Sequence, residues 1–581
     1  MVRFIFGVLA LFGFLVLAGV AGGSYFVYKA MFAVAPLPEA IVLSFDLDRK
    51  LVEEIPDDPL RNRLFGRDLS LRAVVGALDR GAHDQRVRGA VLRLGGDGIG
   101  LAQVQEIRSA LARFHAAGKF TTAFAESFGE FGPGNKSYYL ATACDQIWLQ
   151  PVGMVGLTGL SVEMPFARKA LDQLHIVPEI GHREEFKSAM ETLTESAMSG
   201  PHRLMMESLL NDLGEQMVGA LSVARGLESL AVRRLIDSGP LLAHEALSAR
   251  LIDRVAYFDE AVDAALDVAG KKAGVEAGLV TPDDYLEAAG EPNDSGPTLA
   301  LIFAVGAIER GEGGTVPGGS SVGSEEIVQA FKQAVDDEDV RAILLRVDSP
   351  GGSAVASETI RRAVVQAQAA GKPVIVSMSD MAASGGYWIA MNADRIIAEP
   401  ASLTGSIGVL VGKVATVGLW DSLGIAWDGV RHGRNAGIWS NISGYSPTER
   451  LRVDAVLDDI YATFMLNVAE ARHLSPERVR EIARGRVWTG HQALALGLVD
   501  ELGDLDLALR RAREAVGLPP DSPVSLEVFP RPKSRLERLA ELLTVSGSRI
   551  QTLVEAVAPL VQAVRGSNEA LRMPELGSLM H

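Results

Sequence analysis

Short, mainly apolar runs alternate with longer amphipathic stretches along most of this chain. Ala342–Val347 and Pro373–Val376 are two such runs, and their length and content are typical of strands buried within a sheet. Ser357–Ala370, which lies between them, has the pattern of a helix. Because strands that alternate with helices usually pair in parallel, the sequence predicts an α/β fold with a largely parallel sheet.

The same order of segments occurs twice. Val87–Leu94 (VRGAVLRL) matches Val340–Val347 (VRAILLRV) at an offset of 253 residues. Tyr138–Pro151 matches Tyr387–Pro400 at an offset of 249, so the first half carries four extra residues between the two blocks. Matches that keep their order over two such long spans indicate a tandem duplication rather than a solenoid of short repeats.

The duplication predicts the domain organisation. The first domain is placed at residues 38–290 and the second at residues 297–531. Ala288–Pro297 joins them and is rich in turn-forming residues, as expected of a linker. Residues 532–581 form a tail with helical patterns, for which we expect structural helices.

The N-terminus predicts a membrane anchor. Phe4–Tyr28 is a run of 25 residues without a charge, which exceeds the roughly 20 residues that a helix needs to cross a bilayer. A cleaved signal peptide ending near Gly19–Ala21 is the competing interpretation. The apolar run continues past that point, which favours a retained transmembrane helix within residues 1–37.

Composition excludes several classes of function. The net charge of −17 disfavours nucleic acid as a partner, because phosphate binding needs a basic surface. Cys144 is the single cysteine, so no disulfide can form within the chain, and we expect it to be a small buried side chain. The sequence lacks the HExxH and CxxC patterns of common zinc sites, and no metal or cofactor is predicted.

Chemistry is predicted where the two halves differ. Ser384 lies between an apolar strand and the helical stretch Gly386–Asn392, where the positive end of a helix favours developing negative charge. Gly385 follows directly and would let a substrate backbone approach closely. The first half has Asn135 at the corresponding position. Ser384 is therefore a candidate nucleophile of the second half alone.

A nucleophilic serine needs a base, and two kinds of base are available. Lys187 belongs to the first half and could act once burial lowers its pKa, since the neutral amine is the active form. The second half has no lysine between Lys413 and Lys533, so the halves are complementary. The histidines that follow Ser384 keep a serine–histidine pair open; they are His432, His473 and His491.

An oxyanion hole is predicted at a glycine-rich turn. Gly351 and Gly352 follow a predicted parallel strand, at the edge of the sheet where ligands usually bind. Their amides and the amide of Gly385 would supply the donors. Glycine-rich turns are common, so this motif is weak alone.

Taken together, these features resemble the signal peptide peptidase A family in its long bacterial form, over nearly the whole chain. The resemblance rests on the apolar N-terminus, the duplication and four motifs: DSPGGS (Asp348–Ser353), ASGGYW (Ala383–Trp388), LTGSIG (Leu403–Gly408) and FKSA (Phe186–Ala189).

The resemblance implies a crotonase-like or ClpP-like α/β fold in each half. It implies a serine–lysine dyad with Ser384 as nucleophile and Lys187 as general base. Ser406 would orient the lysine, and its first-half counterpart is Leu157. The implied activity is that of an endopeptidase that degrades cleaved signal peptides and other apolar peptides without a cofactor.

The resemblance also implies a homotetramer on the outer, periplasmic side of the bacterial cytoplasmic membrane, held by one transmembrane helix. Two other functions stay open. A crotonase-like acyl-CoA enzyme would be soluble and is disfavoured by the anchor, and a non-catalytic oligomeric membrane scaffold would leave Ser384 unreactive. Whether the dyad forms within one chain or between neighbours is also open.

Overall fold

The computed structural model describes residues 36–49, 51–53, 69–96, 98–316 and 319–531. The expected N-terminal transmembrane helix and the tail from residue 532 lie outside these ranges. Among the helices that are described, none combines the length and the apolar character needed to cross a membrane.

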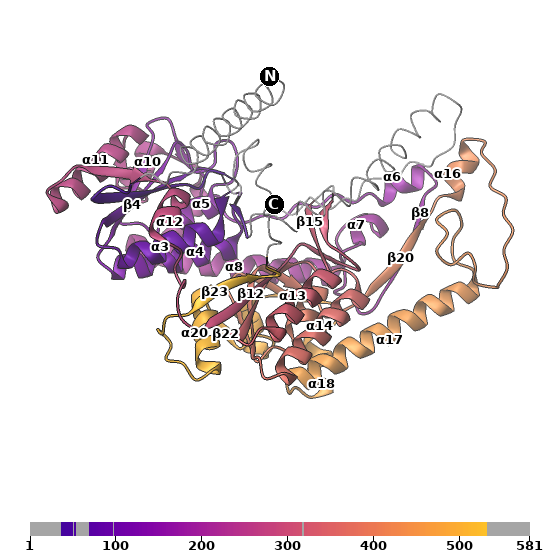
Figure 1. The fold of residues 1–581 in the computed structure, drawn as a ribbon. Coiled ribbons are helices and arrows are strands. Elements are labelled where there is room, and N and C mark those ends of the chain that lie inside the picture. The colour runs from indigo at the N-terminus through magenta and orange to yellow at the C-terminus, as the bar shows by residue number, and fades with distance from the viewer. Residues whose placement is uncertain (1–35, 50, 54–68, 97, 317–318, 532–581) are drawn as a thin grey trace, which may run out of the picture.

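The first half forms a six-stranded parallel sheet with the strand order β11-β1-β4-β5-β6-β10 (Figure 1). Helices α3 and α4 cover one face of this sheet and α11 covers the other. The bounds are β1 (Ala40–Asp46), β4 (Val87–Leu94), β5 (Phe120–Ala125), β6 (Gln146–Leu149), β10 (Arg254–Val255), β11 (Ala277–Val280), α3 (Leu71–His83), α4 (Leu101–Ala116) and α11 (Phe258–Ala273).

The second half repeats this arrangement with the parallel order β23-β12-β16-β17-β18-β22. Helices α13 and α14 cover one face and α20 the other. Strands that follow each other in the same spatial order in both halves confirm the predicted duplication. The bounds are β12 (Thr298–Val305), β16 (Val340–Ser349), β17 (Val374–Ala383), β18 (Arg395–Ala398), β22 (Glu501–Leu502), β23 (Ser525–Phe529), α13 (Ser324–Asp336), α14 (Ala354–Ala369) and α20 (Leu505–Ala515).

Strand β17 runs further than the sequence pattern predicts. Its apolar run suggested an end near Val376, but the strand continues to Ala383 because β19 (Leu403–Gly405) pairs with its last three residues. Ser384 therefore follows the strand directly and precedes α15 (Gly385–Ala390). The pairing that extends β17 comes from a segment about 20 residues later, which local periodicity does not reveal.

A segment of the first half crosses over to the second half. Strand β8 (Val177–His182) pairs antiparallel with β20 (Leu410–Ala415), and together they form a ribbon beside the second domain. Figure 1 shows this ribbon with α6 (Arg168–Gln173), α16 (Val417–Ser422) and the long helix α17 (Pro447–Ala471) as an arm that extends from the body. We call these five elements, with the loops that join them, the arm.

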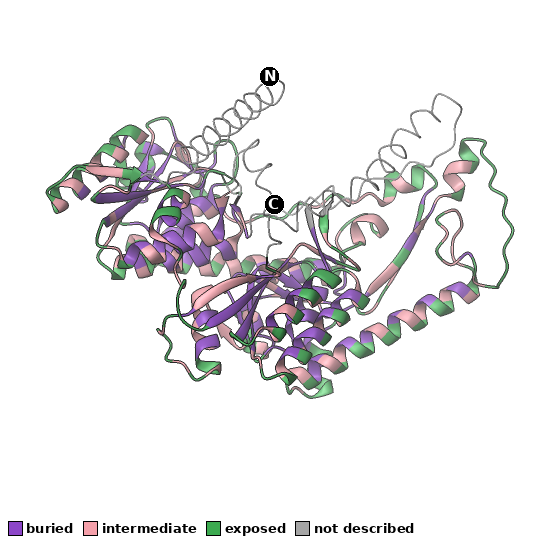
Figure 2. Ribbon diagram, viewed as in Figure 1, coloured by how far each residue is buried: buried purple, intermediate pink, exposed green. Residues whose placement is uncertain are grey.

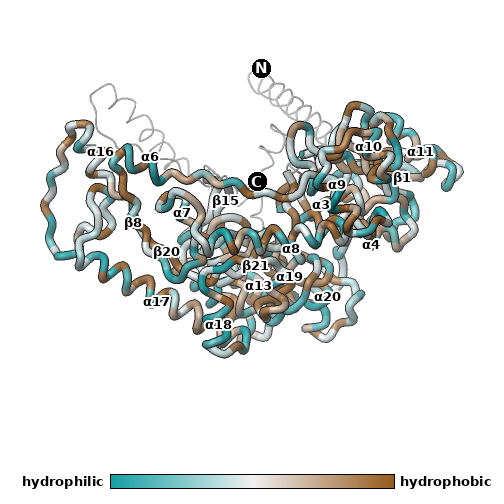
Figure 3. Tube along the Cα trace, turned by 180° about the vertical axis from the view of Figure 1, so that it is seen from behind, coloured by the Kyte–Doolittle hydropathy of each residue, from teal (hydrophilic) through white to brown (hydrophobic). Residues whose placement is uncertain are grey.

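The arm is more exposed to solvent than the two sheets are. Figure 2 shows the sheets as mainly buried and the arm as a mixture of buried, intermediate and exposed residues. Seen from behind, the stretch between α16 and α17 forms the outer rim of the arm (Figure 3). Helix α8 (Gly200–Arg225) then leads the first-half segment back to its own domain.

The remaining elements are β2 (Leu51–Val52), β3 (Leu69–Ser70), α5 (Asn135–Ala141), β7 (Met154–Val155), α7 (Glu191–Thr194), α9 (Ser229–Ser238), β9 (Leu241–Leu242), α10 (Ala243–Ser248), α12 (Pro282–Ala289), β13 (Ala307–Glu309), β14 (Gly314–Val316), β15 (Gly319–Gly323), α18 (Pro476–Ile482), β21 (Val487–Thr489) and α19 (Gly490–Leu496).

Candidate active site

Ser384 sits on a sharp turn at the end of β17. Its backbone has φ 55° and ψ −114°, a conformation that costs a residue with a side chain and that recurs at functional sites. The turn is held by two backbone hydrogen bonds, from Ser384 N to Gly405 O and from Trp388 N to Ser384 O, both 2.9 Å long. One hydrogen bond therefore ties the strained turn to β19, and the other ties it to helix α15.

Lys187 comes from the loop that follows β8, and residues of the second domain hold it. Phe186 N donates to Arg484 O at 3.1 Å. A Cβ atom on Gly485 would lie 2.6 Å from the Cβ of Lys187, and one on Gly408 would lie 3.1 Å from its Cδ. Glycine at these two positions thus leaves the space that the lysine side chain occupies.

The structure brings the sequence-predicted serines and lysine together within one chain. Lys187 Nζ donates to Ser384 Oγ at 3.0 Å, and it also lies 3.0 Å from both the hydroxyl and the carbonyl oxygen of Ser406. The Lys187 side chain is buried, with 7% of the residue exposed. All three contacts are made with oxygen atoms of the second domain, so the site forms only when the two halves dock.

Burial changes the acid–base chemistry of this lysine. Taking the ammonium out of water lowers the pKa of Lys187 from its ordinary value of 10.5 to about 8. A neutral amine can accept a proton, and the lowered pKa makes a useful fraction of it available near neutral pH. The amine and the serine hydroxyl are within the hydrogen-bond reach that proton transfer requires.

The predicted glycine turn packs against the serine. A Cβ atom on Gly351 would lie 2.5 Å from the nitrogen of Gly385, and one on Gly385 would lie 3.1 Å from the nitrogen of Gly352. Gly351 has φ 98°, which favours glycine. Its N–H already donates to Ser349 Oγ at 3.2 Å, which leaves Gly352 and Gly385 as the stronger candidate donors.

The histidines that could have replaced the lysine lie in other surroundings. His491 Nδ1 is 2.8 Å from Asp212 Oδ1, and the backbone N–H of His473 bonds to Glu470 O. His432 is exposed in the arm. Among the described residues, none of these three hydrogen-bonds to Ser384, and the amine of Lys187 takes that place.

A cleft of about 440 Å³ opens beside Lys187. Apolar side chains from both strands of the ribbon line it, including Ile180 and Leu410, together with Met190. Glu185 and Glu191 lie on the same walls. A chain segment that entered this cleft would therefore meet apolar surface next to Lys187.

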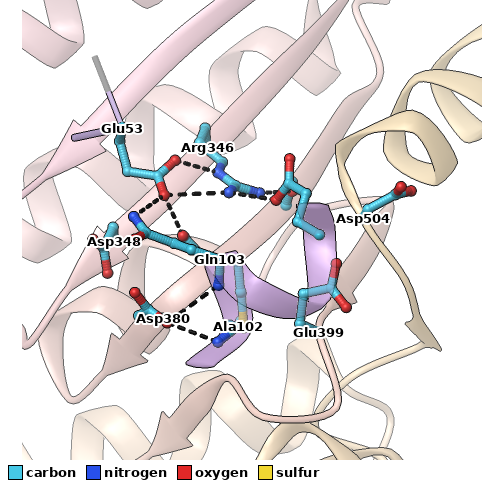
Figure 4. A network of polar contacts seen from close by, with 12 residues as sticks. Glu53, Ala102, Gln103, Arg346, Asp348, Asp380, Glu399 and Asp504 are labelled. Atoms are coloured by element: carbon cyan, nitrogen blue, oxygen red, sulfur yellow. Dashed lines mark hydrogen bonds and ion pairs between the residues drawn. The ribbon is translucent and has the colours of Figure 1, made fainter. Parts of the chain in front are cut away.

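A buried ion-pair network joins the two halves behind the site (Figure 4). Arg346 of β16 is 1% exposed and lies between two carboxylates of the first half. Its guanidinium is 2.9 Å from Glu53 and 2.7 Å from Glu106. Burial raises the pKa of Glu53, but Arg346 and the hydrogen bonds from Ser379 and Gln103 together outweigh this effect and hold the pKa below its usual range. Burial raises the pKa of Glu106 to about 7.

Asp380 connects this network to the serine. It lies four residues before Ser384, and its carboxylate accepts the N–H of Ala102 at 2.9 Å, at the start of helix α4 in the first half (Figure 4). Burial, together with the charge of Glu53, raises the pKa of Asp380 to about 6. The strand that carries the serine is therefore attached directly to the other domain.

Several supporting residues were not singled out by the sequence. Gly408 lay within a quoted motif without a role, and Asp380 lay beside one. Gly485 and Arg346 carry no local signal, because their importance arises from contacts with the other half. Arg346 differs from its counterpart in the first half only in how deeply it is buried. The sequence alone does not show burial, so the duplication did not point to Arg346.

Comparison with known proteins gives a consistent result. The model of peptidase family S49 matches residues 128–272 and 366–519, one stretch in each half. Protease 4 of Salmonella typhi is 34% identical over 525 residues, which cover 87% of this chain and 82% of that protein. Protease 4 of Haemophilus influenzae is 33% identical over 79% of this chain and 75% of its own.

The chloroplastic serine protease SPPA of Arabidopsis thaliana is 29% identical over 85% of this chain and 72% of its own length. A solved structure of a ClpP1 mutant from Listeria monocytogenes covers 35% of this chain at 16% identity, with a TM-score of 0.23. No conclusion about the fold rests on this last likeness.

These relatives define the class of the protein, which is a serine protease and thus a hydrolase. The chain belongs to peptidase family S49.

Proposed function

We propose that this protein is a membrane-anchored endopeptidase that cleaves apolar peptides, remnants of signal peptides among them, with Ser384 as nucleophile and Lys187 as general base. The observation that carries the proposal is the 3.0 Å contact between the buried Lys187 amine and the Ser384 hydroxyl. The pKa of Lys187 of about 8 supports a role as base near neutral pH.

In the proposed mechanism, the neutral Lys187 amine takes the proton of Ser384 while Oγ attacks the carbonyl carbon of the scissile peptide. The amides of Gly352 and Gly385 stabilise the oxyanion that forms, because two preorganised donors act strongly in a water-poor site. The Lys187 ammonium then gives its proton to the leaving nitrogen as the C–N bond breaks, and an acyl-enzyme remains.

Deacylation uses the same groups. Water loses a proton to Lys187 and attacks the ester carbon, and the ammonium returns that proton to Ser384 Oγ as the ester bond breaks. Ser406 keeps the amine directed at Ser384, since its two oxygen atoms are both 3.0 Å from Nζ. The mechanism needs neither metal nor cofactor.

Three further parts of the proposal concern the setting of the enzyme. The uncharged N-terminal run supports a single transmembrane helix within residues 1–37. The catalytic body lies on the outer, periplasmic side of a bacterial cytoplasmic membrane, as the resemblance to the family implies. The domains are assigned to residues 38–290 and 297–531, each with a crotonase-like or ClpP-like fold. The assembly is a homotetramer, as in the family that the sequence resembles.

The test is covalent labelling with a fluorophosphonate, which reacts with activated serines. We expect the label on the peptide that contains Ser384, and we expect Lys187→Met to slow labelling by more than about 100-fold. Lys413→Met is the matched control, because that buried lysine lies elsewhere in the ribbon. Labelling of Ser384 that is equally fast without Lys187 would contradict the role of the lysine.

A further inference from the structure

The matching helices α4 and α14 obtain their N-terminal caps in different ways. In the second half, Ser353 caps α14, and its Oγ accepts the N–H of Ala356 at 3.3 Å. The counterpart of Ser353 at the 253-residue offset is Gly100, which has no side chain to offer to α4. The first N–H groups of a helix have no partner within the helix, so α4 needs an acceptor from elsewhere.

The second half supplies this acceptor. The carboxylate of Asp380 accepts the N–H of Ala102 at 2.9 Å and that of Gln103 at 3.4 Å (Figure 4). Gln103 corresponds to Ala356 at the same offset, so Asp380 has the place at α4 that Ser353 has at α14. A helix of the first half is therefore capped by a side chain of the second half.

Gly100 leaves the room for this carboxylate. The three atoms nearest to a Cβ atom on Gly100 would all belong to Asp380, and they would overlap with it. The backbone of Gly100 has φ −68° and ψ 155°, an extended conformation that serine commonly adopts at N-caps. Glycine is thus required here by the Asp380 side chain and not by the backbone.

Asp380 lies in an irregular part of strand β17. Val347 of β16 pairs with Met378 of β17. Two positions further along β16, Ser349 pairs with Ala382, which is four positions further along β17. Two extra residues of β17 therefore bulge out of the ladder around Asp380, just before the proposed nucleophile. Bulges of this kind re-aim the side chains near them.

The docked first half holds this bulge. Ser379 donates its hydroxyl hydrogen to Glu53, and the next residue, Asp380, binds α4. The third bulge residue is held from within the second half, since the N–H of Met381 donates to Asp348 Oδ1 at 3.0 Å. Two of the three bulge residues are therefore fixed by the first half.

We propose that Asp380 is a positioning residue: its attachment to α4 sets the bulge of β17 and thereby directs Ser384 toward Lys187. The inference rests on the proposed function of these two residues. Lys187 reaches the site from the first half by way of the ribbon, and Asp380 attaches the strand of Ser384 to that same half at a second place. The second attachment fixes the distance between amine and hydroxyl, and small errors of position cost large factors in rate.

The test separates the stability of helix α4 from the position of Ser384. We expect Asp380→Ala to lower the melting temperature by about 2–4 °C. We expect it to slow kcat and the fluorophosphonate labelling of Ser384 by at least about tenfold, with KM within about twofold of the parent. Thr281→Ala is the matched control, because it removes the cap of α12, where Thr281 Oγ1 accepts the N–H of Asp284 at 3.3 Å. It should lower the melting temperature similarly and leave labelling unchanged.

Gly100→Ser combined with Asp380→Ala returns a cap to α4 from within the first half. Gln103 Oε1 already accepts the N–H of residue 100 at 3.2 Å, so serine would complete a capping box there. We expect this double variant to regain the melting temperature of the parent while labelling stays slow. Recovery of both would mean that Asp380 only stabilises the helix, which would overturn the proposal.

Asp380→Asn tests the same role without a change at Gly100. Asparagine caps helices about as well as aspartate does, so we expect labelling within about threefold of the parent. Asparagine as slow as alanine, or alanine as fast as the parent, would contradict the role of Asp380 alone. A parent whose Ser384 takes no label would contradict the proposed function and this role with it.

Discussion

The two halves of this protein share one sheet order and differ at the two positions where the chemistry is proposed. In the second half, Ser384 precedes α15 with a positive φ, and its hydroxyl contacts Lys187. In the first half, Asn135 begins α5 and its side chain binds the backbone of Thr158 and Gly159. The same place in one fold thus holds the proposed nucleophile in one half and hydrogen bonds to the backbone in the other.

The comparison teaches that a duplicated enzyme can divide one site between its copies. In the proposed dyad the first half supplies the amine and the second half supplies the hydroxyls, so neither half alone contains the whole site. The burial that lowers the pKa of Lys187 exists only because the second half surrounds a segment of the first. In the proposed mechanism, docking of the two halves is therefore what makes Lys187 able to act as a base.

The largest expected effect comes from removing the proposed nucleophile. Ser384→Ala should lower kcat/KM for an apolar peptide by at least about 10⁴-fold, because covalent catalysis is lost with it. The measurement is peptide cleavage followed by mass spectrometry, with thermal unfolding to show that the variant is folded. Residual activity within tenfold of the parent would mean that another nucleophile acts.

The next effect concerns the docking of the halves. Arg346→Met should lower the free energy of unfolding by about 3–5 kcal/mol, because it leaves Glu53 and Glu106 buried without their cation. Arg93→Met is the matched control from the first half, where the ion pair with Glu126 is exposed and should contribute less than about 1 kcal/mol. Chemical denaturation measures both, and equal losses would contradict the difference in burial.

A smaller effect is expected at the residue that orients the lysine. Ser406→Ala removes one acceptor of the Lys187 amine and should lower kcat by roughly 10- to 100-fold, with little change in KM. Ser406 has φ 50°, which disfavours β-branched threonine, so Ser406→Cys is the matched variant: it keeps the size of the side chain but offers a much weaker acceptor. We expect cysteine to recover little of the loss, and full recovery by cysteine would mean that the hydroxyl has no part in positioning the lysine.

At the corresponding position of the first half, we expect a substitution to change stability but not activity. Asn135→Ala should lower the free energy of unfolding by about 1–3 kcal/mol, since it removes three hydrogen bonds to the backbone of Thr158 and Gly159, while activity at low temperature stays within about twofold of the parent. Thermal unfolding and peptide cleavage separate the two effects. A large loss of activity in a folded variant would show that the first-half position also takes part in the reaction.

The finest test is the pH dependence. Burial lowers the pKa of Lys187 to about 8, and the protonated form cannot act as a base. We therefore expect kcat/KM to rise about tenfold per pH unit below pH 8 and to level off above it. A rate that falls between pH 6 and 9 would contradict a lysine base.

The sequence by itself determined the α/β fold and the duplication, because strand periodicity and repeated blocks are local or collinear signals. It also pointed to Ser384 and Lys187 as candidates, since each occurs in one half only. The tertiary structure decided that the two residues, 197 positions apart, meet within one chain at 3.0 Å. It decided too that the N–H of Gly351 is engaged by Ser349, and that Arg346 is buried while Arg93 is exposed. These outcomes depend on how the two halves dock, and burial created by distant segments leaves no trace in the pattern of neighbouring residues.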